Sequence, residues 1–257
     1  MSAAGVVTVA FTSRAGEANR PYKVGGLSFI AVGFLFVSKY VLDLVAGTPP
    51  SSGAEILAWR TAKELPLAIA NEVLFVAAML LVPAVLALYG CLAQVDRTKV
   101  AAGCGLIATT IPIILIVDIV QGRLVYPVYG LHVDTPVVAE LVVAVYYGGL
   151  HAVGLVFAVA TVLLSLVMRR GVFGRNIGYL GFAAGAFDFL GAYPETIGPM
   201  SVLVSQVLFA TWFVAVGSKL FAVRAPVAGH SVLDSEAERS TVRRRPDALM
   251  ARKEGLE

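Results

Sequence analysis

Charge is scarce in this sequence. Of its 257 residues, 14% are charged and 58% are hydrophobic. Soluble domains carry about 25% charged residues, so this composition excludes an ordinary soluble globular protein. The formal net charge of +3 is small and lies in the connecting segments, which gives no indication of nucleic-acid binding. We therefore expect an all-α, polytopic membrane protein whose main partner is the lipid bilayer.

Residues that ligate metals or act as nucleophiles are also few. The chain has two cysteines and three histidines. Cys91 and Cys104 fall at the ends of two consecutive apolar segments without metal-ligand spacing, so we interpret them as packing residues. The sequence has no P-loop, dinucleotide-binding fingerprint, zinc-finger pattern or nucleophile elbow. It predicts neither a metal nor a cofactor, and it argues against an enzyme.

Long apolar runs, by contrast, are abundant. A helix that crosses a bilayer needs about 20 apolar residues. We predict a six-helix transmembrane bundle over residues 24–224, between a cytoplasmic N-terminal segment (1–23) and a disordered cytoplasmic tail (225–257). The six predicted spans are Val24–Ala46, Leu67–Ala93, Val100–Val120, Val137–Met168, Ile177–Tyr193 and Met200–Val223.

The basic residues indicate the orientation of these spans. All but four of the 20 lysines and arginines fall on one side of the predicted membrane. Lys39 lies inside the first span, and Arg60, Lys63 and Arg123 lie on the other side. Because cytoplasmic loops carry an excess of basic residues, both termini are predicted to be cytoplasmic.

The longest apolar segment, residues 135–170, carries a polar stripe. At 3.6 residues per turn, Glu140, Tyr147 and His151 share one arc of the helix. A polar stripe on a spanning helix faces other helices or a water-filled cavity rather than lipid. The small and polar residues Gly154, Ala158, Thr161 and Ser165 continue this arc, and Val142, Val145, Val156, Val159 and Leu163 form the opposite one.

Ionisable groups of the other spans fall at the same level, in the outer half of the membrane. Lys39 and Asp43 are one helical turn apart and are predicted to pair. Because charges in lipid are costly, we expect a polar chamber that opens outward, with Asp188 and His151 at its centre. The predicted ligand-binding or ion-binding residues are Asp188, His151, Asp43, Asp118, Glu72, Tyr147, Lys39 and Glu140.

The same residues are also compatible with purely structural roles. Glu72, Asp118 and Glu140 stand close enough to helix ends to be merely interfacial. Asp188 and His151 would then make simple hydrogen bonds between helices. The sequence is compatible with both the polar chamber and these structural roles.

Proline and glycine suggest local departures from regular helix packing. Pro112 stands near mid-membrane and frees the backbone carbonyl of Ala108, which Thr109 or Thr110 is predicted to satisfy. Gly181 and Gly185, with Gly178 a turn earlier, are predicted to let the fifth span approach a neighbour closely.

Three segments carry a resemblance to known proteins. They are LVPAVLALYGCL (Leu81–Leu92), NIGYLGFAAGAFDFLG (Asn176–Gly191) and TWFVAVGSKLF (Thr211–Phe221). They resemble an uncharacterised family of bacterial six-span membrane proteins of unknown function. The resemblance implies an all-helical bundle in the inner (plasma) membrane of a bacterium and carries over no catalytic residue.

Three functions are compatible with these features. The leading hypothesis is a small-solute or cation transporter or binder coupled to protons. The second is an accessory subunit of a larger membrane complex, in which the polar stripe meets a protein partner or a second copy of the chain. The third is a membrane-embedded enzyme that acts on lipid at the outer leaflet.

Overall fold

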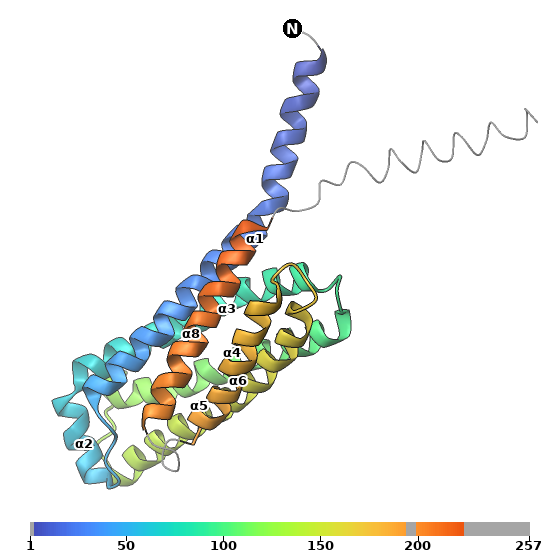
Figure 1. Ribbon diagram of the computed structural model, residues 1–257. Helices are drawn as coiled ribbons and strands as arrows, with labels where there is room; N and C mark the ends of the chain where they lie inside the picture. Colours follow the sequence, from blue (N-terminus) through green and yellow to red (C-terminus); the bar gives the residue numbers. More distant parts are fainter. Residues whose placement is uncertain (1–2, 194–198, 224–257) are drawn as a thin grey trace, which may run out of the picture. The chain divides into compact units, whose positions relative to one another are not determined.

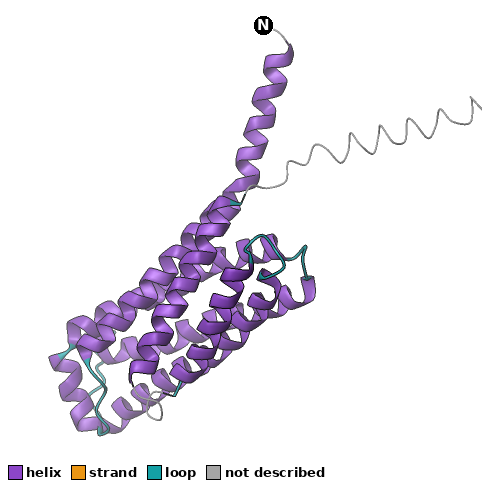
Figure 2. Ribbon diagram, viewed as in Figure 1, coloured by secondary structure: helices purple, strands orange, loops and turns teal. Residues whose placement is uncertain are grey.

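The computed structural model describes residues 3–193 and 199–223, with side chains for residues 19–193 and 200–223. Over these residues the chain forms seven α-helices and no strand (Figures 1 and 2). Their bounds are α1 Ala3–Ala46, α2 Gly53–Ala62, α3 Glu64–Leu92, α4 Arg97–Val125, α5 Pro136–Met168, α6 Arg175–Gly191 and α8 Pro199–Ala222.

Five segments of the described chain are long and apolar enough to cross a membrane. They are Asn19–Ala46, Glu64–Leu92, Arg97–Val125, Pro136–Met168 and Met200–Ala222. The protein is thus an all-helical, multi-pass membrane protein. The fifth predicted span, Ile177–Tyr193, corresponds to α6, which has 17 residues and is not among these five segments.

The chain divides into two units, of which residues 20–223 form one, called the bundle below. The other comprises residues 1–19 and 224–257. Helix α1 begins at Ala3, about 20 residues before the start expected from hydropathy, because the polar residues that precede the apolar run are themselves compatible with a helix. The predicted disordered tail, 225–257, lies outside the described residues.

The short helix α2 was not expected from the sequence. It packs its buried residue Ile56 against the ends of α4 and α5, because Ile56 shares an apolar cluster with Leu124 and Ala139. Trp59 Nε1 donates a hydrogen bond of 2.8 Å to the carbonyl oxygen of Ala46, at the end of α1. Helix α2 therefore covers the end of the bundle where α1 finishes and α5 begins.

Glycines bring α6 close to α5. A methyl group on Gly185 would lie 3.0 Å from the carbonyl oxygen of Ala158, and one on Gly178 would lie 3.1 Å from that of Ser165. On Gly181 it would lie 2.0 Å from Ser165 Oγ. The predicted close approach of this segment to a neighbour is confirmed.

Helices α1 and α8 meet through a reciprocal pair of glycines. A methyl group on Gly26 would lie 2.7 Å from the carbonyl oxygen of Gly217, and one on Gly217 would lie 2.6 Å from that of Gly26. Since the obstructing atoms are backbone atoms, neither side can yield by turning a side chain.

An aromatic cluster fills the space between α1, α5 and α8. The ring of Phe157 on α5 lies 6.3 Å from that of Phe36 on α1 and 5.3 Å from that of Phe209 on α8. Phe213 and Trp212 are fully buried beside them. Ring packing therefore contributes to holding α1, α5 and α8 together.

The prediction for the carbonyl freed by Pro112 is wrong. Thr109 Oγ1 donates to the carbonyl oxygen of Leu106, and Thr110 Oγ1 donates to that of Ile107, both at 2.7 Å. A helical hydroxyl reaches the carbonyl three or four residues back, so Ala108 is too close along the chain to either threonine.

Candidate functional site

A buried ion pair lies between α1 and α5, near the end of the bundle covered by α2. Lys39 Nζ donates to Asp43 Oδ2 at 2.5 Å, which confirms the predicted pairing. Lys39 is only 9% exposed, and its ammonium group lies 5.4 Å from the ring centroid of Tyr146. A carboxylate and an aromatic face together compensate a cation that would otherwise be costly within the membrane.

Asp118 on α4 continues this polar region toward α3. Its side chain is 2% exposed. The side-chain amide of Asn71, turned so that its nitrogen faces α4, donates to the carbonyl oxygen of Asp118 at 2.9 Å and to Oδ1 at 3.1 Å. The carboxyl group also interacts electrostatically with Glu72 and Lys39. One set of interactions thus connects α1, α3, α4 and α5.

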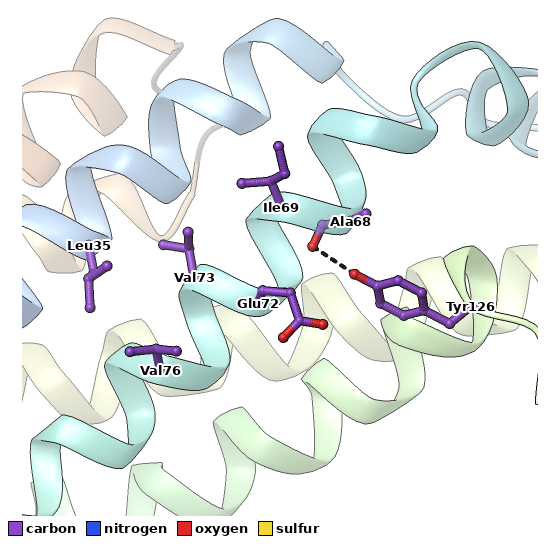
Figure 3. A pocket seen from close by; sticks show the side chains of 7 residues that line it. All are labelled: Leu35, Ala68, Ile69, Glu72, Val73, Val76 and Tyr126. Carbon is purple, nitrogen blue, oxygen red and sulfur yellow. Dashed lines mark hydrogen bonds between the residues drawn. The ribbon is translucent and has the colours of Figure 1, made fainter.

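Glu72 on α3 lines a pocket (Figure 3). The pocket has a volume of about 270 Å³, and Glu72 is its only charged lining residue. Tyr126 Oη donates to the carbonyl oxygen of Ala68 at 3.1 Å. The other lining residues are apolar: Leu35, Ala68, Ile69, Val73 and Val76.

Tyr126 lies just beyond the end of α4 and keeps its proton. Burial, together with the nearby charges of Glu72 and Asp118, raises the pKa of its hydroxyl group above the usual value. Tyr126 therefore supplies an uncharged aromatic ring beside Glu72, while its hydroxyl group donates to Ala68.

Gln121 adds an unpaired acceptor one turn along α4 from Asp118. Its side chain is 4% exposed, and Oε1 has no hydrogen-bond partner among the described residues. A buried acceptor without a partner costs about 1–3 kcal/mol. This atom is consequently an unsatisfied acceptor in the interior of the bundle.

Asp188 and His151, which the sequence predicts to share the centre of a chamber, make separate contacts in the structure. Asp188 is 8% exposed, and Ser205 Oγ on α8 donates to its Oδ1 at 3.2 Å, while Oδ2 is buried without a partner. His151 Nδ1 lies 2.8 Å from the carbonyl oxygen of Ala192, just after α6. Over the described part of the chain, no hydrogen bond or ion pair joins Asp188 to His151.

The predicted arc of Glu140, Tyr147 and His151 is not the buried face of the outer part of α5. Glu140 is exposed, and its Oε1 accepts a hydrogen bond of 2.6 Å from the backbone nitrogen of Gly53, at the start of α2. Tyr147 is 36% exposed, although it interacts electrostatically with Lys39. The buried residues at this level are Ala139, Val142, Tyr146, Val153 and Phe157.

Sequence reasoning missed Tyr146 and Tyr126 and left Asn71 out of the site. Tyr146 is adjacent to Tyr147 but points into the bundle, with only 1% of its surface exposed. The one available signal for Asn71 is its place directly before Glu72, as an amide in the outer part of an apolar span. Nothing in the local pattern distinguishes Tyr146 from its neighbour.

No three histidine, cysteine, aspartate or glutamate side chains converge to hold a metal within the part of the chain that the structure describes. Comparison of the chain with protein-family models, with curated proteins and with solved structures finds no match. The resemblance to bacterial six-span proteins therefore stays a prediction.

Proposed function

We propose that the protein is a proton-coupled transporter or binder of a small organic cation, located in a bacterial inner membrane. In this proposal all six long helices span the membrane and both termini are cytoplasmic. The rise of α6 is roughly 26 Å at 1.5 Å per residue, close to the thickness of the hydrocarbon core. The distribution of basic residues supports the orientation.

The pocket at Glu72 has the chemistry of a cation site. A carboxylate and an aromatic ring, here Glu72 and Tyr126, attract a positive charge from two sides. The apolar walls suit the hydrocarbon part of an organic cation better than a hydrated metal ion. A small alkylammonium or arylammonium compound is therefore the class of solute that we propose.

The observation that carries this proposal is that Glu72 lines the pocket while the buried Asp118 is held by Asn71, the residue directly before Glu72. Two neighbouring carboxylates in a medium of low dielectric constant favour binding one positive charge, which can be a proton or a cation. Entry of a cation beside Glu72 would thus promote release of a proton from Asp118. Asp188, with its unpaired Oδ2, is a second proton-carrying group in this proposal.

Benzyltrimethylammonium is a suitable probe, since it combines a fixed positive charge with an aromatic body. In proteoliposomes with an imposed pH gradient, we expect the wild-type protein to accumulate it. Glu72→Gln is expected to reduce binding and uptake by about tenfold or more, because a charge-assisted contact contributes about 1.5–3 kcal/mol. Asp118→Asn and Asp188→Asn should retain binding in detergent and lose uptake driven by the gradient.

Glu64→Gln is the matched control, because Glu64 is an exposed carboxylate at the start of the same helix. It should behave as the wild type does. Uptake by Glu72→Gln at the wild-type rate, or an equal loss in Glu64→Gln, would contradict the proposal. So would a wild-type protein that fails to bind the probe.

A further inference from the structure

A group of basic side chains lies at the end of the bundle opposite the candidate site. Here the turn between α3 and α4 contacts the turn between α5 and α6, since a methyl group on Gly171 would lie 3.4 Å from Val95 Cγ2. We call this region the basic corner. Its charged residues are Asp96, Arg97, Lys99, Arg169, Arg170 and Arg175.

The single acid of the basic corner is already engaged. Asp96 caps α4 by accepting a hydrogen bond of 3.1 Å from the backbone nitrogen of Lys99, and it also pairs with the Lys99 ammonium group. These contacts hold the pKa of the Asp96 carboxyl below its usual value, with a smaller contribution from Arg170. Asp96 is consequently occupied by α4 and makes no ion pair with Arg169.

Arg169 is held in place by packing rather than by an opposite charge. Its guanidinium carbon lies 5.2 Å from the ring centroid of Phe182 and 5.9 Å from that of Tyr179. The side-chain stem crosses α6 at Gly178, where a methyl group would come within 2.3 Å of Arg169 Cγ. Nε is buried, and Arg169 makes no side-chain hydrogen bond or ion pair with any described residue.

This arrangement suits a ligand that brings both negative charge and hydrocarbon. A guanidinium group binds phosphate through paired N–H donors, and a fixed guanidinium loses little freedom when it does so. Beside it, Tyr179 is 58% exposed and Val172 is 65% exposed, so an apolar outer surface adjoins the cation. Basic pockets between spanning helices are known to bind the headgroups of anionic lipids.

We propose that the basic corner binds the phosphate of an anionic phospholipid, with Arg169 as its main contact and Arg170 and Arg175 beside it. The acyl chains would lie along the exposed face of α6 at Tyr179. Five cations and one engaged acid favour a headgroup with net negative charge. A zwitterionic headgroup would bring its own ammonium group close to these five cations, which would repel it.

The thermal unfolding midpoint of the detergent-solubilised protein tests this proposal. Phosphatidylglycerol should raise the wild-type midpoint by about 5 °C or more, whereas phosphatidylcholine and inorganic phosphate should not. Arg169→Gln should lose most of that shift. Arg169→Lys, which keeps the charge but not the planar fork, should retain less than half of it. Lys219→Gln, at an exposed cation of the last turn of α8, should keep all of it.

Native mass spectrometry of the wild-type protein gives a second readout that requires no variant to fold. Phosphatidylglycerol should bind at least fivefold more tightly than phosphatidylcholine. Equal binding of the two lipids would overturn the proposal, as would equal shifts in the wild type and Arg169→Gln. A full shift with inorganic phosphate alone would assign the corner to a free anion and would also overturn it.

Discussion

Replacing Asp43 with asparagine should destabilise the bundle by about 3–5 kcal/mol, because it leaves the buried ammonium group of Lys39 without its counter-ion. The two side chains are only 11% and 27% exposed, so water cannot replace the carboxylate efficiently. The free energy of unfolding in mixed detergent, followed by tryptophan fluorescence and circular dichroism, measures the effect.

The double variant Lys39→Met with Asp43→Leu removes both charges. It therefore distinguishes the cost of leaving Lys39 unpaired from the cost of losing the ion pair as a whole. Apolar groups of similar size often replace a buried ion pair without net cost, so stability should recover to near that of the wild type. Asp96→Asn is the control, because Asp96 pairs with Lys99 at an exposed position and should have a much smaller effect. An effect of Asp43→Asn no larger than that of Asp96→Asn would contradict the burial of this pair.

Adding one methyl group at Gly26 is expected to produce the second large effect. Gly26→Ala places that group 2.6 Å from the backbone nitrogen of Phe221 and 2.7 Å from the carbonyl oxygen of Gly217, so α1 and α8 must separate. Overpacking of this kind costs about 1–3 kcal/mol or more. The reciprocal change, Gly217→Ala, should cost a similar amount, and the two should not add, because either one separates the same helices.

Gly105→Ala provides a control, because its expected effect on stability is opposite in sign to that of Gly26→Ala. Gly105 lies within α4 with no atom within 4 Å of the added methyl group. Since alanine favours a helix over glycine by about 0.5–1 kcal/mol, this change should stabilise the protein slightly or leave it unchanged. A neutral effect of Gly26→Ala would show that α1 and α8 do not approach each other as described.

The helical segments could be predicted from the sequence because spanning helices require long apolar runs. α3, α4, α5 and α8 each begin within a few residues of the predicted spans. Helix α2 escaped prediction because its ten residues combine polar and apolar side chains in a segment too short for a span. Its position depends on tertiary contacts, above all the hydrogen bond between Glu140 and Gly53.

The buried face of each helix was harder to predict, and α5 shows why. In a soluble protein an apolar stripe marks the core, but in a bilayer the lipid-facing surface is as apolar as the interior. Val142 is buried at 8% exposure while Val145 is 40% exposed, although both are valines within one turn. Lys39 and Asp43 were predictable because their pairing is local, whereas the contact of Lys39 with Tyr146 depends on how α1 and α5 pack.

Lys39 and Asp118 face the interior of the bundle, whereas their neighbours along α1 and α4 are exposed on its surface. Photolabelling of the wild-type protein with a diazirine carried on a lipid acyl chain, read by peptide mass spectrometry, tests this arrangement directly. Ile116 and Ile119 are 60% and 63% exposed and should be labelled strongly, as should Val41 at 50%. Asp118 and Lys39 should remain unlabelled, and labelling of either at the level of these neighbours would contradict the buried polar site.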